Sequence, residues 1–543
     1  MKRIIIGVLA IFTSLVSNAF SGSGLGTEKS PYLITSANEL FEMRSDLNAH
    51  YKLMNDIDLG AWIEDNSPIQ GWIPIGTVSS PFNGVFDGNE KAIKNLFIKR
   101  ENSDNIGLFG FVQTAILKNI VLLNTDIIGH DNVAALIGNR NVSTNYDQIG
   151  LGQLNISNCY VVGGYIKGNN CIGGIIGRNE GSGNGNAITI DKCHNSANIK
   201  GVNQVGGICG YTEGWGSSPI YIRNSYSIGN INGNDNVGGI VGYFYSNYTW
   251  ISKYDCGRPD LVCEKNYVRG NIIGLNNTNG IAGYSTAADW VPGSWGAPTV
   301  TGIYTMASNV CIADTLQGQN RISSNVSSSD NYASNNTIVV LSNGGSVDVE
   351  DNQNNGTSMS VRLLQKSTTY QSLNWDFYTT WRDMSSNDEY PILKNQSAAP
   401  IVESFESKSK GSIKGTAPFA NGTIYVIIKK NMYESPVEDG KWNVSLGNIV
   451  EKEEATVFAC ENGKIPSATI HSFAEKKEYV PDIILGDSNS DSVVDAADVV
   501  CTTNYILGKP SSSFNDKNAD VNNDGQILID DAVGTVNIIM NEQ

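Results

Sequence analysis

The chain has 543 residues, a formal net charge of −17 and 17% charged residues, which is enough length for several domains. The negative charge argues against nucleic-acid binding through phosphate contacts, because such binding needs a surplus of Lys and Arg. Beyond the amino terminus, no apolar stretch approaches the roughly 18 residues that a membrane helix needs. We therefore expect no membrane span in the mature chain.

The amino terminus has the features of a secretory signal. Lys2 and Arg3 precede an apolar run over residues 4–16, and Ser17-Asn18-Ala19 supplies a small-x-small cleavage site. We expect residues 1–19 to be a signal peptide and the mature chain to be secreted, either extracellular or at the cell surface. Nine cysteines permit disulfides in that setting without requiring them.

Two pairs of cysteines are candidates for disulfides. Cys256 and Cys263 bracket a short segment inside a long insertion, so a bridge there is plausible. Cys159 and Cys193 hold equivalent positions in adjacent copies of the repeat described next, where they either pair or fill space.

A glycine-rich phrase recurs through the first half of the chain, as in NVGGIVGY (236–243) and QVGGICGY (204–211). Three columns of equivalent residues align the copies. The closing glycines are Gly110, Gly138, Gly177, Gly210, Gly242 and Gly283. Eleven residues before five of them stand Ile127, Ile166, Ile199, Ile231 and Ile272. Further upstream stand Tyr160, His194, Tyr226 and Tyr267.

Each copy contains short β-branched runs bounded by glycine and lacks the 3.6-residue apolar period of a helix. A unit this small cannot bury its apolar face alone, so successive copies must stack with parallel strands roughly 4.8 Å apart. We predict a parallel β-solenoid (β-helix) over residues 20–395, with the isoleucine column buried and glycines where a side chain would not fit. A capping box, Ser36 with Glu39, predicts a short helix that covers the first coil.

Several phrases, including YLITSANEL, NDIDL, FNGVFDG and the repeated VGGIVG, resemble those of bacterial secreted proteins with GLUG-type repeats, over roughly residues 30–395. This resemblance implies a surface or secreted binding role, attached in some members to a protease domain. The four histidines of this chain include no H-E-x-x-H spacing, which excludes a zinc peptidase of that kind.

Residues 398–480 differ in character from the repeats. Short apolar runs of about six residues alternate with Gly, Asn and Pro turns, which is the spacing of a small β-sandwich. The pattern resembles bacterial immunoglobulin-like modules, which implies a structural spacer.

The carboxy-terminal segment, residues 481–543, holds eleven Asp and Glu against two Lys and so carries a charge of −9. It contains two twelve-residue loops, 487–498 and 520–531, with oxygen-bearing residues at positions 1, 3, 5 and 12 and a backbone carbonyl at position 7, as in EF-hand calcium loops. We predict two calcium ions as cofactors. The predicted ligands are Asp487, Asn489, Asp491, Val493 (carbonyl) and Asp498, then Asp520, Asn522, Asp524, Gln526 (carbonyl) and Asp531. Position 6 is Gly525 in the second loop and Ser492 in the first, so the first loop is expected to bind more weakly.

An apolar helical stretch follows each loop, and the pair of loops resembles a type I dockerin. That resemblance implies a small α-helical module that docks to a cohesin module of a partner protein. Positions ten and eleven, where that family often carries Ser-Thr, are Ala496-Ala497 and Ile529-Asp530 here. The alternative is a calcium-stiffened end cap without a partner.

The solenoid offers a second recognition surface, because the insertions between its copies fall at one corner and are rich in aromatic residues. The candidates for ligand binding are Tyr211, Trp215, Tyr245, Tyr248, Trp250, Trp290 and Trp295. Such rings stack on glycans or anchor a host or cell-surface protein, or else pack on one another.

These observations favour a secreted or cell-surface, non-catalytic binding protein or adhesin that docks through its carboxy terminus. We single out no catalytic residue, because the charges in the repeats fall in no common column. The alternative is a polysaccharide-active β-helix enzyme, recruited to a complex by the same tail for polysaccharide catabolism. A cleft with two carboxylates roughly 5–10 Å apart would favour the enzyme.

Overall fold

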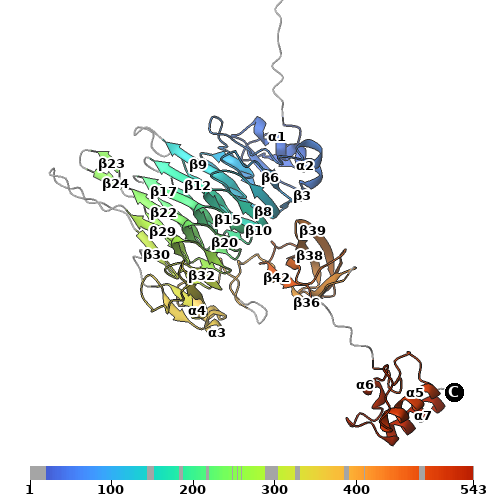
Figure 1. Ribbon diagram of the computed structural model, residues 1–543. Coiled ribbons are helices and arrows are strands. Elements are labelled where there is room, and N and C mark those ends of the chain that lie inside the picture. Colours follow the sequence, from blue (N-terminus) through green and yellow to red (C-terminus); the bar gives the residue numbers. More distant parts are fainter. Residues whose placement is uncertain are drawn as a thin grey trace, which may run out of the picture. The chain divides into compact units, whose positions relative to one another are not determined.

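The computed structural model describes most of the chain, namely residues 20–143, 152–182, 187–215, 219–247, 249–252, 255–257, 260–287, 304–324, 330–384, 390–408, 410–475 and 483–541. The predicted signal peptide, residues 1–19, lies outside this set. Two compact units emerge, Met1–Glu475 and Lys476–Gln543 (Figure 1). The fold is mainly β, and the helices of the second unit are an exception.

Three parallel sheets make up the first part of the larger unit, which we call the parallel region (residues 20–395). The six-stranded sheet contains β7 (Phe109–Val112), β9 (Ile137–Ser143), β12 (Ile176–Ser182), β17 (Cys209–Trp215), β22 (Val241–Asn247) and β29 (Ala282–Ala287). The four-stranded sheet contains β11 (Asn170–Gly173), β16 (Asn203–Gly206), β21 (Asp235–Gly238) and β28 (Asn276–Asn279).

The third sheet has 23 strands and includes the two longest, β8 (Ala115–Ile128) and β10 (Leu154–Lys167). Its other strands are β1 (Tyr32–Ile34), β2 (His50–Leu53), β3 (Ile57–Asp58), β4 (Val85–Asp87), β5 (Ala92–Lys94), β6 (Phe97–Lys99), β13 (Ile188–Asp191), β14 (His194–Asn195), β15 (Asn198–Lys200), β18 (Ile220–Arg223), β19 (Tyr226–Ser227), β20 (Ile231–Asn232), β25 (Leu261–Glu264), β26 (Tyr267–Val268), β27 (Ile272–Ile273), β30 (Tyr304–Ala307), β31 (Val310–Cys311), β32 (Thr315–Gln317), β33 (Tyr332–Ser334), β34 (Ile338–Val340) and β35 (Thr357–Met359).

The isoleucine column of the repeats is a stack of directly paired residues. Ile127 pairs with Ile166, Ile166 with Ile199, Ile199 with Ile231, and Ile231 with Ile272, all in parallel register. Every one of these side chains is buried. The prediction of a single buried column is therefore confirmed, and Figure 1 shows the successive strands lying side by side.

The closing glycines are required by close backbone packing. A Cβ atom added to Gly177, Gly210 or Gly242 would lie only 2.6, 2.4 or 2.5 Å from a backbone nitrogen of an earlier repeat. Since real Cβ atoms do not approach backbone so closely, any side chain at these positions would push the stacked strands apart.

Short helices flank the parallel region. The predicted capping box is present at α1 (Ala37–Glu42), where Ser36 and Glu39 bond each other's backbone N–H groups. The other helices of this unit are η1 (Met43–Ser45), α2 (Gly60–Asn66), α3 (Val361–Leu364) and α4 (Ser367–Gln371). A separate antiparallel ribbon, β23 (Thr249–Ser252) with β24 (Asp255–Gly257), lies within an insertion.

The candidate disulfides do not form. Cys159, Cys193 and Cys263 are all free and buried. Each takes an apolar position inside the parallel region, where Cys159 pairs in register with Ile120 and Cys263 with Ile222. These thiols therefore serve as small core side chains.

Residues 401–475 form one antiparallel sheet of seven strands, which we call the antiparallel region. Its strand order is β36-β37-β40-β39-β38-β41-β42, so all seven strands belong to one continuous hydrogen-bonded array. The sequence pattern predicts a β-sandwich, which has two separate sheets. The strands are β36 (Ile401–Glu406), β37 (Ser412–Thr416), β38 (Asn421–Ile428), β39 (Asn431–Glu438), β40 (Lys441–Ser445), β41 (Glu454–Glu461) and β42 (Ile470–Phe473).

The antiparallel region packs directly on the parallel region, so it does not act as an extended spacer. Tyr425, Ile427 and Phe458 share one apolar cluster with Leu123 and Val162 of β8 and β10. Residues on both faces of these two strands are apolar and buried. A strand that is apolar on both faces must be covered on both, and the antiparallel region provides the outer cover.

The second unit contains α5 (Ala496–Ile506), α6 (Asp516–Ala519) and α7 (Ile529–Asn541). No helix in the part of the chain that the structure describes is long and apolar enough to cross a membrane.

Candidate functional sites

The first predicted calcium loop, residues 487–498, is closed by hydrogen bonds from backbone N–H groups to carboxylates. The Asp487 carboxylate accepts from the N–H groups of Asp491 and Ser492, both at 3.1 Å. The Asp498 carboxylate accepts from the third and ninth residues of the loop, at 3.0 and 2.9 Å. The carboxylates of Asp487 and Asp498, the first and last residues of the loop, are therefore both held by backbone N–H groups of that loop.

The second loop, residues 520–531, repeats this arrangement. The Asp520 carboxylate accepts from the N–H groups of Asp524 and Gly525 at 3.1 and 2.9 Å. The Asp531 carboxylate accepts from the third and ninth residues at 3.3 and 2.9 Å. Because the two loops use the same positions in the same roles, their folding is set by the spacing of the acidic residues.

The electrostatics of both loops call for a cation. Asp498 and Asp531 are fully buried, and within residues 483–541 no loop carboxylate has an ion-pair partner. Burying carboxylates with only backbone donors as partners is costly, and a bound cation removes most of that cost. Hard carboxylate and amide oxygens are the donors that calcium prefers, so the residues present fit calcium. All ten predicted ligand residues lie in these two loops.

The two loops are connected through Asn518, which is buried between them. The Asn518 side-chain amide donates to the backbone carbonyl oxygen of Asp487 at 2.9 Å, and the backbone carbonyl of Asn518 accepts from the backbone N–H of Gly486 at 2.8 Å. Asn518 also lies two residues before Asp520, the first residue of the second loop. Asn518 therefore links the start of the first loop to the start of the second through hydrogen bonds and a short stretch of backbone.

Each loop leads directly into a helix, as the sequence predicts. At α5, Asp495 is the N-cap and forms a capping box with Asp498, which thus serves both the loop and the helix. Helices α5 and α7 pack against each other. Five apolar residues of these helices are solvent-exposed, namely Val500 on α5 and Ile529, Val533, Val536 and Met540 on α7.

Residues 485–533 match the family described as Dockerin type I domain. Type I dockerin domains bind calcium and dock to a cohesin-bearing partner. Residues 485–533 therefore contain a dockerin-type domain, and the two loops with their predicted calcium ligands lie within it.

The chain is also similar to parts of two much longer proteins. It is 37% identical over 141 residues, 25% of this chain and 16% of the relative, to a protein of Evansella cellulosilytica named as a Gly-rich membrane protein. It is 32% identical over 164 residues, 29% of this chain, to the Halomucin of Haloquadratum walsbyi. The chain spans only 16% and 2% of the length of these curated relatives.

Among solved structures, the chain resembles one whose title names an immunoglobulin A1 protease from Bacteroides ovatus. The sequence identity is 19% and the TM-score is 0.41, over 68% of this chain and 94% of that chain.

The predicted aromatic surface is only partly within the described residues. Tyr211 is buried and stacks on Tyr243, which in turn stacks on Tyr284, with ring centroids 4.9 and 5.0 Å apart. Burial and a hydrogen bond to Glu213 raise the pKa of Tyr211 well above its usual range. Tyr245 is half-buried, with its ring 5.8 Å from that of Tyr243. These rings pack largely on one another.

Other members of that surface lie outside what can be described. Tyr248, Trp290 and Trp295 are outside the described residues. Trp215 lies in β17 and Trp250 in β23, but the positions of their side chains are outside the description. The ligand-binding role of all seven aromatic residues stays a prediction.

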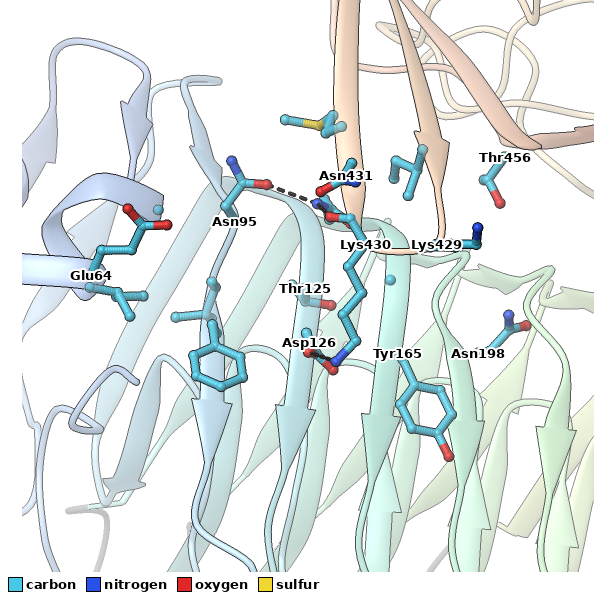
Figure 2. Close-up of a pocket in the computed structure, with 18 of the residues that line it drawn as sticks. Glu64, Asn95, Thr125, Asp126, Tyr165, Asn198, Lys429, Lys430, Asn431 and Thr456 are labelled. Atoms are coloured by element: carbon cyan, nitrogen blue, oxygen red, sulfur yellow. Dashed lines mark hydrogen bonds and ion pairs between the residues drawn. The ribbon is translucent and has the colours of Figure 1, made fainter. Parts of the chain in front are cut away.

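A cleft of about 950 Å³ lies where the antiparallel region meets the parallel region (Figure 2). Its floor consists of strands β6, β8, β10 and β15, and its roof is the β38–β39 turn together with the start of β41. Lys430 reaches from the turn down to Asp126, with which it forms an ion pair. Lys429 pairs with the buried Glu453 at 2.7 Å.

Sequence reasoning does not find this cleft, because its walls are about 300 residues apart. Asp126 stands out only as one of several scattered charges, and Lys430 as a turn residue. One signal is available in the runs IVLL (120–123) and YVV (160–162), which are apolar on both faces of their strands. Such runs predict that another part of the chain covers the outer face.

Proposed function

We propose that this chain is a non-catalytic, secreted or cell-surface binding protein whose carboxy-terminal module docks to a cohesin-bearing partner when two calcium ions are bound. The observation that carries the proposal is the pair of matched loops, each with a fully buried aspartate that lacks a cationic partner. Dockerin-containing proteins are typically extracellular or at the cell surface, which agrees with the signal-like amino terminus.

The exposed apolar face of α7 supports the docking role. Ile529, Val533, Val536 and Met540 recur at the helical spacing of one face, and all four are exposed. A module this small gains nothing from exposing four large apolar side chains unless a partner covers them. Ile529 of this face stands at one of the Ser-Thr positions common in the family, so we expect a cohesin with an apolar docking surface.

For the parallel region we propose a β-solenoid of the GLUG type, followed by an immunoglobulin-like module that braces its flank. The in-register columns and the inward isoleucines support the first assignment. The second assignment rests on the antiparallel pairing of the seven strands in residues 401–475, which form one hydrogen-bonded array instead of two sheets. Together they form a rigid body on which a recognition surface can be placed.

The cleft carboxylates argue against glycoside hydrolysis, which needs a protonated acid beside a second carboxylate. A hydrogen bond from Lys429 lowers the pKa of Glu453, and one from His471 lowers the pKa of Glu454. Asp126 is ion-paired with Lys430. Glu453 and Glu454 are thus poorly suited to donate a proton, which supports binding over catalysis.

The docking proposal can be tested with an immobilised type I cohesin module and the full chain. We expect retention in calcium and loss of retention in EDTA. Asp524→Ala removes a predicted ligand of the second loop and should weaken retention by about tenfold or more, equivalent to ~1.4 kcal/mol. Asp516→Ala, which removes an exposed acid outside the ligand positions, is the matched control and should bind like the parent.

A second variant separates calcium binding from docking. Val533→Asp places a charge on the exposed face of α7 and should abolish retention while calcium binding, measured by calorimetry, is unchanged. Retention that is equal in calcium and EDTA, or that survives Val533→Asp, would overturn the proposed docking mode.

A further inference from the structure

The cleft between the parallel and antiparallel regions has the volume of a ligand site. At about 950 Å³ it lies at the upper end of the range of roughly 300–1,000 Å³ found for small-molecule sites. It is also formed by two regions that pack through an apolar cluster, so its shape is preformed. We next consider which chemical groups its floor presents.

Four side chains cross the floor of the cleft in one row. Phe97 pairs in register with Asp126, Asp126 with Tyr165, and Tyr165 with Asn198. All four residues line the cleft, and each precedes a buried isoleucine, so the row lies on the outward face of its sheet. Neighbouring strands are ~4.8 Å apart, which places the Phe97 and Tyr165 positions ~10 Å apart.

This row alternates ring faces with hydrogen-bonding groups. Phe97 and Tyr165 are half-buried, so each leaves part of its ring exposed to the cleft. Figure 2 shows the side chains of Asp126, Tyr165 and Asn198 side by side along the floor. Aromatic faces stack on the apolar faces of sugar rings, while carboxylate and amide groups bond sugar hydroxyls. The spacing of the two aromatic positions exceeds that of two directly linked sugar rings and fits alternate rings of a chain, with the intervening ring over Asp126.

Two buried polar atoms at the floor lack hydrogen-bond partners. They are the hydroxyl oxygen of Thr125, a fully buried residue, and the Oδ1 atom of Asp126. Buried polar atoms in native proteins nearly always have partners, so an unpaired one calls for an explanation. The floor is therefore short of hydrogen-bond partners at Thr125 and at Asp126, the second of which belongs to the row described above.

A line of asparagine side chains begins at Asn198 in the cleft and extends beyond it. Asn198 accepts from the backbone N–H of Asn230 at 2.9 Å, and Asn230 accepts from the backbone and side-chain N–H groups of Asn271 at 3.0 and 3.1 Å. These three residues form a line of amides across successive strands of the same sheet. An elongated ligand could therefore extend from the cleft along this line.

The charges of the lining select among ligand classes. Four acids, Glu64, Asp126, Glu453 and Glu454, line the cleft against two lysines, Lys429 and Lys430, which leaves a charge of −2. This surplus repels uronate, sulfate and phosphate groups. A neutral ligand rich in hydroxyls avoids that cost and uses the Asp126–Lys430 pair as both acceptor and donor.

We propose that this cleft binds a neutral oligosaccharide, with sugar rings lying along the row Phe97, Asp126, Tyr165 and Asn198. The site is distinct from the insertion aromatics, and it goes beyond the docking function because it requires neither calcium nor a cohesin. The carboxy-terminal module would bring a partner to the chain, while the cleft would hold the chain on a glycan.

The test is affinity electrophoresis of the full chain in gels containing one soluble polysaccharide each. The neutral probes are β-glucan, xylan and mannan, and the anionic probe is polygalacturonate. We expect at least one neutral probe to retard the chain, equally in calcium and in EDTA. Tyr165→Ala should weaken that binding by about tenfold, or ~1.4 kcal/mol. Tyr165→Phe keeps the ring and should retain most of it.

Tyr221→Ala is the matched control, since Tyr221 is another half-buried tyrosine on an outward position of the same sheet, outside the cleft lining. It should bind like the parent, and all variants should melt within a few degrees of it. The proposal is overturned if no neutral probe retards the chain, if polygalacturonate binds best, or if Tyr165→Ala and Tyr221→Ala behave alike. Loss of cohesin retention in EDTA would leave these readouts unchanged, so the two proposals fail separately.

Discussion

The parallel region and the carboxy-terminal module bury opposite kinds of side chain. In the parallel region the buried column is isoleucine over isoleucine. Among described residues 483–541, seven buried side chains are polar and three are apolar. The same module leaves Ile529, Val533 and Met540 exposed. The larger unit is therefore closed by its own apolar side chains, whereas the buried carboxylates of the module call for a cation and its exposed apolar face calls for a partner.

Removing calcium is the strongest way to test this contrast. In EDTA the module should unfold, because Asp498 and Asp531 would be buried without a compensating charge. Each site contributes ~4 kcal/mol at free calcium a thousandfold above its Kd. Calorimetry of the full chain should show one transition that vanishes in EDTA and one, from residues 20–475, that does not move. Two transitions that are identical in calcium and EDTA would contradict the comparison.

The complementary test damages the parallel region alone. Ile199→Ala removes one member of the buried column and leaves a cavity, so it should lower the free energy of unfolding of the larger unit by about 3 kcal/mol. The calcium-dependent transition should not change. Lys200→Ala, the adjacent exposed position, is the control and should have an effect of no more than ~0.5 kcal/mol. A shift of the module's transition by Ile199→Ala would show that the units are coupled.

A buried histidine makes the larger unit sensitive to acid. His194 stacks on Tyr226 with centroids 4.3 Å apart, and burial lowers its pKa to about 3. The unfolded chain binds a proton below about pH 6.5, whereas the folded chain does not until near pH 3. Stability should thus fall as the pH drops through this window, by ~1.4 kcal/mol per pH unit from this group.

Substituting His194→Tyr should remove that loss, because the equivalent residues in the column are Tyr160, Tyr226 and Tyr267. We expect a gain of ~2 kcal/mol over the parent at pH 5, growing at lower pH, in chemical denaturation of the larger unit. His130 is the control, since a hydrogen bond to Asp104 raises its pKa, and His130→Asn should not relieve the acid sensitivity. Equal acid slopes for His194→Tyr and the parent would contradict the prediction.

Local features of the fold were predictable from the sequence, because each repeats or has fixed spacing. The isoleucine and tyrosine columns follow from the repeat, the helix at Ser36 from its capping box, and the calcium loops from ligand spacing. A further column was missed. Asn105, Asn132, Cys171, Gln204, Asn236 and Asn277 all adopt the left-handed backbone conformation, with φ between 45° and 61°, and four of these six are asparagine, which tolerates it.

The cleft and the packing of the antiparallel region were not predictable in the same way. Asp126 and Lys430 are brought together by a contact between regions, and no periodicity relates them. Val121 and Leu123 are the residues that indicate this packing in the sequence, because they are apolar and lie on the outward face of β8. They predict that something covers the strand but not which part of the chain does so.

The prediction with the smallest expected effect compares the two calcium loops of the carboxy-terminal module. Ser492 and Gly525 hold position 6 with φ of 72° and 81°. A serine pays about 1 kcal/mol for this conformation relative to glycine. If the loop adopts it fully only when calcium is bound, the strain lowers calcium affinity. Ser492→Gly should therefore strengthen calcium binding at the first loop about fivefold, as measured by calorimetric titration.

The reverse substitution, Gly525→Ser, should weaken the second loop by a similar factor, and no atom lies within 4 Å of the added Cβ. A steric clash therefore cannot explain weaker calcium binding by this variant, which leaves backbone strain at position 6 as the cause. The double variant Ser492→Gly/Gly525→Ser exchanges the two position-6 residues and should reverse the order in which the loops fill. If the order of filling is unchanged, loop affinity is set by the surrounding helices and by Asn518 rather than by position 6.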